Sequence, residues 1–249
     1  MQLGVVADVH ANLPALETAL EALAGADALV CAGDLVGYGP KPNECVAVLR
    51  EAGALCVAGN HDLMAIADEP IEVGDRLVST TMRYTRAAID DATRAFLAEL
   101  PGARTVAEEV VVAHGALGDP WRYVRDSHAA LVELERLEDG RLLVLGHTHR
   151  PLAVADDGSE AAPDVVVLGD RRWVLNPGSV GQSREREAHV RVLVLDLAAR
   201  TARFRALPYD VERARDDLRR AGLPVEALHR HPRSWRTRAR RALRLKARS

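Results

Sequence analysis

Residues 55–62 read Leu-Cys-Val-Ala-Gly-Asn-His-Asp, so a short apolar run passes directly into an amide, an imidazole and a carboxylate. The run is typical of a buried strand, and the glycine permits a sharp turn after it. A strand that ends in three adjacent polar side chains presents them at an edge of a sheet, where a ligand can reach them. The triplet Asn60-His61-Asp62 alone also fits an Asx-turn that leads into a helix. Its function depends on which partners the rest of the chain brings to that edge.

Strands and helices alternate before this stretch. Apolar runs predict strands at 3–7, 28–32 and 55–58, and apolar residues at helical spacing predict helices at 14–23 and 43–52. This order is typical of a doubly wound α/β fold. Because its crossovers are right-handed, the carboxyl ends of the three strands meet at one edge of the sheet.

The regular alternation of predicted strands and helices ends after residue 62. Residues 76–100 predict one long helix or two shorter ones, and the segment 63–100 is either a cap over the site or an ordinary packed helical region. The short connection at 198–200 predicts an antiparallel hairpin. Further strands are expected at 110–113, 142–145, 165–168, 172–175, 190–196 and 201–207, with helices at 129–137 and 209–221.

Composition sets the class of protein. A chain of 249 residues that is 48% hydrophobic can bury a full core. No apolar run approaches the roughly 20 residues that span a bilayer, and the N-terminus lacks a basic signal-peptide region, so we expect no membrane partner. The three cysteines Cys31, Cys45 and Cys56 lie in or near apolar segments, which indicates small core residues in a reducing compartment. We expect a cytoplasmic protein.

Polar clusters end five of the expected strands. In Asp8-x-His10 and His147-x-His149, the spacing of two points both side chains the same way if the backbone is extended. Carboxylate, amide and imidazole ligands without thiolate suit Mn²⁺, Fe or Zn²⁺. The five clusters are Asp8-Val9-His10, Gly33-Asp34, Gly59-Asn60-His61-Asp62, His114-Gly115 and Gly146-His147-Thr148-His149.

Each cluster alone has an ordinary structural explanation. Asp8 or Asp34 could cap the following helix, and His114 could be a hydrogen-bonded core histidine. Together the clusters supply enough ligands for two ions that share one carboxylate. Two such ions about 3.5–4 Å apart can activate a water and clamp the oxygens of a phosphate ester. The combination favours a metal site.

The order D-x-H, G-D, G-N-H-D, H-G, G-H-T-H resembles that of the calcineurin-like metallophosphoesterase superfamily. It is similar in particular to small prokaryotic members of the phosphodiesterase and diadenosine tetraphosphatase-like kind. The resemblance covers residues 1–207 and includes the stretches 33–40 and 176–182. It implies an α/β fold, a four-layer αββα sandwich with mixed sheets. The charged helical pattern and the basic residues after it predict a separate basic helical extension at 208–249.

The resemblance also implies roles for individual residues. Asp34 bridges two divalent ions, which could be Mn, Fe, Zn or Mg. His61 stabilises the transition state or protonates the leaving oxygen, and Asp62 sets the tautomer of His61. The first ion is held by Asp8, His10, Asp34 and His149, and the second by Asp34, Asn60, His114 and His147.

The implied reaction is hydrolysis of a phosphate monoester or diester by a metal-bridging hydroxide. The expected substrate is a nucleotide or another small molecule. The loop at 35–39 lacks the acidic residue that some members carry after the bridging aspartate. No arginine obviously replaces the phosphate-binding arginines of the protein phosphatases, so their activity is not carried over.

Two other functions stay open. Residues 229–249 contain nine Arg or Lys and no acid in a chain of net charge −3, which fits either a nuclease or a solvated terminal helix docked by Trp235 and Leu243. The other alternative is a metal-binding scaffold without catalysis, against which the intact His61 argues. Four residues on loops after the metal-bearing strands could bind a base or phosphate, or simply pack: Tyr38, Trp121, Arg122 and Tyr123.

Overall fold

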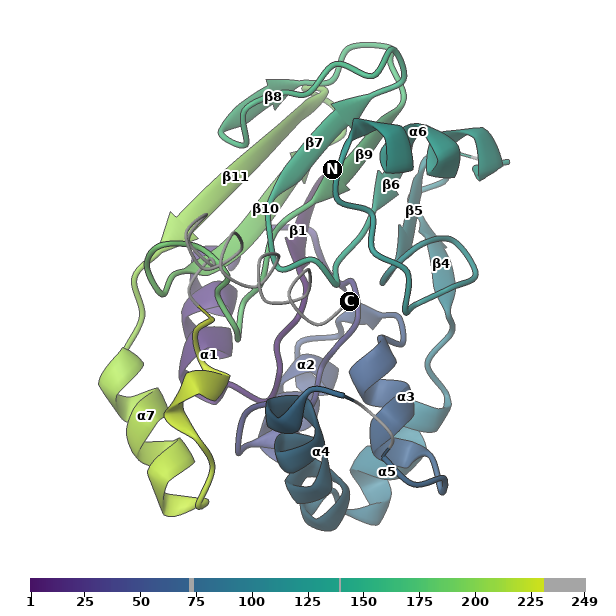
Figure 1. Ribbon diagram of the computed structural model, residues 1–249. Helices are drawn as coiled ribbons and strands as arrows, with labels where there is room; N and C mark the ends of the chain where they lie inside the picture. Colours follow the sequence, from purple (N-terminus) through teal and green to yellow (C-terminus); the bar gives the residue numbers. More distant parts are fainter. Residues whose placement is uncertain (72–73, 139, 231–249) are drawn as a thin grey trace, which may run out of the picture.

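Two β-sheets pack face to face between layers of helices in the computed structural model, which describes residues 1–71, 74–138 and 140–230 (Figure 1). The first sheet has the order β3 (Leu55–Cys56), β2 (Ala28–Cys31), β1 (Gln2–Val6), β10 (Val190–Asp196), β11 (Thr201–Leu207) and β8 (Val165–Val167). The second has the order β4 (Ala103–Val106), β5 (Val110–Ala113), β6 (Leu142–Val144), β9 (Trp173–Asn176) and β7 (Leu152–Ala155).

Both sheets are mixed. In the first, β1, β2 and β3 run parallel, and β1 pairs antiparallel with β10. In the second, β5, β6 and β9 run parallel, whereas β4 and β7 are antiparallel edge strands. The parallel strands of each sheet therefore send their carboxyl ends, and the loops that follow them, to a common edge.

Alternation along the central strands divides the core into layers. On β10, Leu193 and Leu195 face the second sheet, while Val190 and Val192 face the helices. This period of two is what a strand covered on both faces requires. The inner cluster joins the sheets through side chains such as Val112 of β5.

Helices cover the outer face of each sheet (Figure 1). Those on the first sheet are α1 (Leu13–Ala22), α2 (Pro42–Glu51), α3 (Asn60–Ile66), α4 (Arg76–Ala88) and α5 (Asp91–Ala98). Helix α6 (Ser127–Arg136) covers the second sheet, and α7 (Val211–Arg220) packs against α1 and precedes the 3₁₀ helix η1 (Val225–Ala227).

The four-layer αββα fold predicted from the sequence is confirmed, and the strands at 190–196 and 201–207 form the expected hairpin. The segment 76–100 forms two helices because Asp90 interrupts it and caps the second with its side chain, which accepts from the Thr93 N–H at 2.7 Å. The sequence analysis missed β4 and β7, and it named the start of α3 only as an alternative, a turn at Asn60-His61-Asp62 that leads into a helix. Helix α3 was hidden because its first residues belong to the polar cluster.

The segment 63–100 belongs to the helical layer. Ala65, Met82 and Leu97 are buried in the same cluster as the outer residues of β1 and β10. A second role as a cap over the site stays a prediction, as does the domain boundary at residue 207. The expected docking of Trp235 and Leu243 lies outside the described residues. Among the residues that are described, no helix is long and apolar enough to cross a membrane.

The inner core supplies a test of the sandwich. Leu193 lies fully buried between the sheets, so we expect Leu193→Ala to lower the free energy of unfolding by about 2–5 kcal/mol. Chemical denaturation measures the change. Val167→Ala, on an edge strand and 73% exposed, is the matched control and should cost less than about 0.5 kcal/mol. Equal effects of the two substitutions would contradict the packing described.

Candidate metal centre

The loops after β1, β2, β3, β5 and β6 bring the predicted ligands together in the interior. Two groups of potential ligand atoms form, each with its atoms within 4.8 Å of one another. All seven of the predicted metal ligands are buried. The first group is Asp8, His10, Asp34 and His149, and the second is Asp34, His114 and His147.

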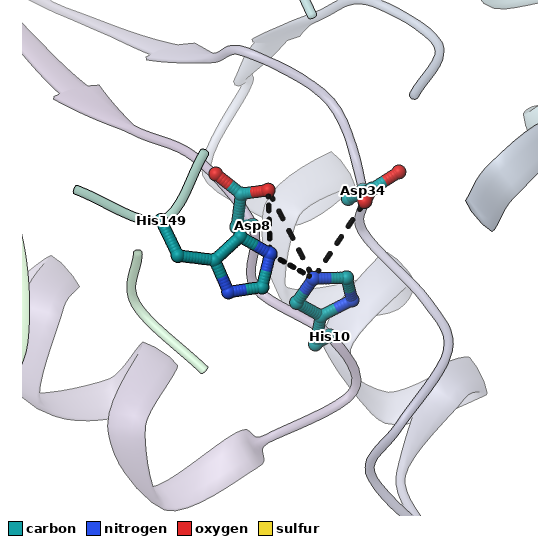
Figure 2. A group of neighbouring side chains, drawn as sticks. All are labelled: Asp8, His10, Asp34 and His149. Atoms are coloured by element: carbon teal, nitrogen blue, oxygen red, sulfur yellow. Dashed lines mark hydrogen bonds and ion pairs between the residues drawn. The ribbon is translucent and has the colours of Figure 1, made fainter. Parts of the chain in front are cut away.

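The first group is compact (Figure 2). The Nε2 atoms of His10 and His149 lie 3.1 Å apart. His149 Nε2 lies 3.3 Å from Asp8 Oδ1, and His10 Nε2 lies 3.6 Å from Asp34 Oδ2. Two imidazoles and two carboxylates thus point their ligand atoms at one small volume.

Asp34 joins the first group to the second. Its Oδ2 lies 3.2 Å from His114 Nε2, which in turn lies 3.1 Å from Asn60 Oδ1. The rings of His114 and His147 have their centroids 5.0 Å apart. Asn60 therefore presents its amide oxygen to the second group through His114.

The backbone at the site is unusual. Asp8, His10, Asp34, His147 and His149 all have φ between 49° and 67°, in the left-handed region. The extended backbone that would point both side chains of Asp8-x-His10 and His147-x-His149 the same way is therefore absent at these residues. The side chains converge because each strand turns sharply at its end, and such conformations cost of order 1–3 kcal/mol each.

A glycine allows one of these close approaches. A Cβ at Gly59 would lie 2.1 Å from Asp34 Oδ1 and 2.3 Å from the Asp34 backbone nitrogen. The Asp34 carboxylate instead accepts a hydrogen bond from the His61 N–H at 2.8 Å. The glycine of the Gly59-Asn60-His61 turn is thus needed to seat the shared carboxylate.

Hydrogen bonds to backbone carbonyls fix the tautomers of the histidines. Nδ1 of His10, His114 and His149 lies 2.7–3.1 Å from the carbonyl oxygens of Val36, Ala32 and Gln182 respectively. His147 makes the same kind of contact through Nε2, 3.0 Å from the Trp121 oxygen. A carbonyl oxygen only accepts, so the nitrogen facing it carries the proton and the other nitrogen holds a lone pair.

Those lone pairs supply a test of whether the residues suit metal ions. The Nε2 lone pairs of His10 and His149 face each other at 3.1 Å. Such contacts are repulsive in neutral rings and become favourable around a shared cation. The donor set of oxygen and imidazole therefore fits divalent ions.

Charge at the site leads to the same conclusion. Burial raises the pKa of Asp8 to about 8. The pKa of His147 is lowered to about 4, mainly by burial and further by the nearby charge of His114. Burial acts to lower the pKa of His114 as well, but Asp34 and Asp8 outweigh it and raise that pKa to about 9. Without an ion the site keeps protons where a metal would bind.

His61 lies beside the first group without belonging to it. Its ring centroid is 4.8 Å from that of His10 and 4.7 Å from that of Tyr38. Its Nδ1 is buried and has no hydrogen-bond partner among the described residues. A Cβ at Gly37, whose φ is +89°, would lie 2.3 Å from that atom. The side chain is packed in place yet keeps its bonding capacity.

Asp62 makes different contacts from those expected. Its two carboxylate oxygens accept hydrogen bonds from the backbone N–H groups of Gly59 (2.9 Å) and Val36 (3.1 Å). Burial and then Asp34 raise its pKa to about 7. Among the described residues no hydrogen bond joins this carboxylate to the His61 ring, so the geometry gives Asp62 the role of tying the β2 and β3 loops together.

The stretch 176–182 holds two of the ligand-bearing loops in place through side-chain hydrogen bonds. Asn176 Nδ2 donates to the Gly146 oxygen at 2.6 Å and to Thr148 Oγ1 at 3.2 Å, which holds the loop between His147 and His149. Ser179 Oγ donates to the backbone carbonyl oxygen of Asp8 at 2.9 Å. Both contacts are made by side chains of the stretch that the resemblance to the superfamily had included.

C-terminal residues hold that stretch in turn. The buried Gln182 side chain donates to the Ala227 oxygen at 3.0 Å, and the Ser183 N–H donates to the Leu228 oxygen at 3.2 Å. The Gln182 carbonyl is the one that His149 contacts. Nothing in the sequence pattern indicated this support, because the two segments lie about 45 residues apart.

The loop between β5 and α6 forms another wall. Tyr123 stacks on His147 with centroids 3.9 Å apart, and the Arg125 guanidinium covers the Tyr123 ring at 3.8 Å. Trp121 contacts His147 through its carbonyl and leaves its side chain 50% exposed. The buried Glu133 of α6 anchors the loop by accepting from the Leu117 N–H at 2.8 Å.

Comparison with known proteins agrees with this arrangement. Residues 1–200 match the calcineurin-like phosphoesterase superfamily domain. A metallophosphoesterase from Sphaerobacter thermophilus has a similar crystal structure, with a TM-score of 0.82 and 29% identity over 92% of this chain and 96% of that one. An uncharacterized protein of Methanocaldococcus jannaschii is 27% identical over 89% of this chain and 93% of its own.

A more distant structure, that of a putative diadenosine tetraphosphatase, shares the fold with a TM-score of 0.51 and 21% identity, over 83% of this chain and 94% of that one. The chain belongs to the calcineurin-like phosphoesterase superfamily, as the order of its polar clusters predicted. Membership implies divalent metal cofactors, for which the two ligand groups are the candidate sites.

The protonation of the site predicts how metal affinity depends on pH. With pKa values of about 8 and 9, Asp8 and His114 are largely protonated at pH 7 and must lose those protons to bind an ion. Affinity for Mn²⁺ should therefore rise from pH 6 to pH 9, by up to about tenfold per unit for each proton released. Calorimetry in buffers of different ionisation enthalpy counts those protons, and a constant affinity would contradict the protonation described.

Proposed function

We propose that this protein is a phosphoesterase with a dinuclear metal centre. The observation that carries the proposal is the position of Asp34, whose carboxylate belongs to both ligand groups. A carboxylate shared in this way suits two ions held close together. Asp8, His10 and His149 would complete the first site, and Asn60, His114 and His147 the second.

Bound divalent ions supply Lewis acidity and an activated water for attack on phosphorus. The chain orients that chemistry by fixing which nitrogen of each imidazole is free, through the four backbone carbonyl contacts. It also excludes bulk water, because every proposed ligand is buried.

His61 is proposed to protonate the leaving oxygen. It lies next to the His10 ring, is packed against Gly37 and Tyr38, and keeps an unpartnered Nδ1 among the described residues. A histidine held beside the reacting group can act as a general acid. Burial lowers the pKa of His61 below its usual value, so its acid form is favoured below neutral pH. Asp62 would act indirectly, by fixing the backbone from Gly59 onward through its hydrogen bonds.

The proposed substrate is a small-molecule phosphate ester, such as a nucleotide. Trp121, which contacts His147 through its carbonyl and is 50% exposed, offers aromatic surface near the ligands, as stacking on a base requires. A nuclease stays the second candidate, supported by the basic sequence at 229–249. We also propose a cytoplasmic location, because all three cysteines are buried free thiols, as a reducing compartment allows.

A metal-reload screen tests the activity. Metal-stripped protein is reloaded with Mn²⁺, Fe²⁺, Zn²⁺ or Mg²⁺ and assayed on bis-p-nitrophenyl phosphate and on the monoester. We expect hydrolysis with at least one ion and a requirement for Asp34, tested with Asp34→Asn. Failure of every reload would contradict the enzyme and favour a metal-binding scaffold.

The role of His61 has its own test. His61→Ala should keep both ions, measured by elemental analysis, and lose about 10²–10⁴-fold in kcat, the range for removal of a general acid. His128→Ala is the matched control, because His128 is an exposed histidine of α6 that belongs to neither ligand group. This substitution should leave kcat unchanged. Loss of an ion in His61→Ala would make His61 a ligand and overturn its assignment.

A further inference from the structure

Tyr38 lies on the loop after β2, four residues beyond Asp34, and only 2% of it is exposed. Its ring centroid is 4.6 Å from that of His10 and 4.7 Å from that of His61. The centroids of His10 and His61 are 4.8 Å apart, so the three rings form a closed triangle. The sequence left open whether Tyr38 binds a base or packs, and its burial against these histidines is packing.

Ring packing is what holds the His61 imidazole. Its Nδ1 has no hydrogen-bond partner among the described residues, and the Asp62 carboxylate bonds to backbone N–H groups instead. His10 differs, because its Nδ1 lies 3.1 Å from the Val36 carbonyl oxygen. Loss of the Tyr38 ring would therefore leave His10 with its hydrogen bond and free His61 to rotate.

The backbone around Tyr38 is fixed by its surroundings. Tyr38 has a φ of 51°, a left-handed conformation that is uncommon for a bulky residue. The N–H of the next residue, Gly39, donates to the backbone oxygen of His10 at 2.9 Å. A strained conformation of this kind persists only where the surrounding structure determines it.

Much of that surrounding structure comes from residues 209–230, which we call the C-terminal unit and which contain α7 and η1. The match to the superfamily domain ends at residue 200, so the whole unit lies beyond it. Tyr38 nevertheless belongs to the same buried apolar cluster as five residues of this unit. They are Ala214, Leu218, Leu223, Ala227 and Leu228.

The C-terminal unit is also fastened to α4. The Arg230 guanidinium donates to Asp75 Oδ2 at 2.8 Å, and Asp75 is the N-cap residue of α4. Leu77 and Val78, in the first turn of that helix, pack against the cluster that contains Tyr38. Apolar packing and an ion pair therefore fix the unit against Tyr38 from two directions.

We propose that Tyr38 is a positioning residue for His61 and that the C-terminal unit holds Tyr38 in that position. This role rests on the proposed phosphoesterase function, in which His61 protonates the leaving oxygen. A catalytic side chain has to stay within about 0.5 Å of its productive position. Misplacement by about 1 Å can cost about 100-fold in rate. Residues outside the superfamily domain thus determine where the proton donor lies.

Four substitutions separate the parts of this arrangement. Tyr38→Leu removes the ring, Tyr38→Phe keeps it, and Leu218→Ala loosens the C-terminal unit while Tyr38 stays. Tyr209→Leu is the matched control, because Tyr209 packs against the same cluster but makes no ring contact with a histidine within the described part of the chain. Circular dichroism and elemental analysis check that each full-length variant folds and keeps its ions.

The kinetic test compares two leaving groups with the Mn²⁺-loaded protein. We expect Tyr38→Leu to lower kcat by about 10- to 100-fold on phenyl phosphate and by less on p-nitrophenyl phosphate, because the more basic leaving oxygen depends more on a proton donor. Leu218→Ala should show the same dependence with a smaller loss. Tyr38→Phe and Tyr209→Leu should match the parent protein. Equal losses of Tyr38→Leu on the two substrates, or loss of bound metal in that variant, would overturn the proposal.

A double-mutant cycle tests whether Tyr38 acts through His61. In the His61→Ala background, Tyr38→Leu should have little further effect on kcat, because the residue that it positions is already absent. Losses that add in the double variant would place the action of Tyr38 elsewhere and would also overturn the proposal.

Proton NMR of the Zn²⁺-loaded protein reports the placement of His61 without turnover. The ring signals of His61 are identified by their absence in His61→Ala. Leu218→Ala retains both rings, so a shift of these signals in that variant reports a change in how Tyr38 and His61 lie together. We expect a shift in Leu218→Ala and none in Tyr209→Leu, and unshifted signals in Leu218→Ala would contradict the role of the C-terminal unit.

The NMR measurement also separates this role from the proposed function. A shift of the His61 signals in Leu218→Ala, in a protein that hydrolyses no ester with any ion, would support the placement of His61 through Tyr38 and contradict the enzyme. Hydrolysis by the parent protein, with unshifted signals in Leu218→Ala and parent rates in Tyr38→Leu, would contradict the positioning role and leave the enzyme standing.

Discussion

The shared carboxylate of Asp34 is the interaction on which the rest of the centre depends. It lies 3.2 Å from His114 and 3.6 Å from His10, so it holds imidazoles from both sheets. Its seat requires a glycine at position 59 and a hydrogen bond from the His61 N–H. Burial opposes its charge, but His114 and His61 outweigh burial and lower its pKa well below the usual value. A carboxylate kept ionised inside a protein is a strong attraction for cations.

The sandwich supplies the rigidity that this arrangement needs. Apolar side chains between the sheets, including Leu193 and Val112, fix the two sets of strand ends relative to each other. The ligands from β1 and β2 then meet those from β5 and β6 without a flexible element between them. Left-handed backbone at five ligand positions is tolerated because close packing on both faces leaves the loops no alternative. The packed core thereby fixes the positions of the ligand side chains relative to one another.

Much of this could be predicted from the sequence, since buried strands read as apolar runs and their polar ends stand out against them. The five polar clusters came from that contrast, and the resemblance to the superfamily then implied which seven of their residues are ligands. What escaped prediction depends on tertiary contacts. The hydrogen bonds of Asp62 to Gly59 and Val36 replace an expected contact with His61, and no local pattern encodes that choice. The edge strands β4 and β7 escaped prediction because they are only four residues long, too short for a clear alternation of apolar and polar residues.

The contact between Gln182 and Ala227 has a consequence for how the protein matures during translation. The ligands are spread from Asp8 to His149, yet the loop that orients His149 is held by backbone acceptors at Ala227 and Leu228. A nascent chain that has emerged only as far as its last ligand lacks that brace, and Gln182 keeps an unsatisfied donor. The His149 side of the centre can therefore take its final form only after residues 227 and 228 have been synthesised.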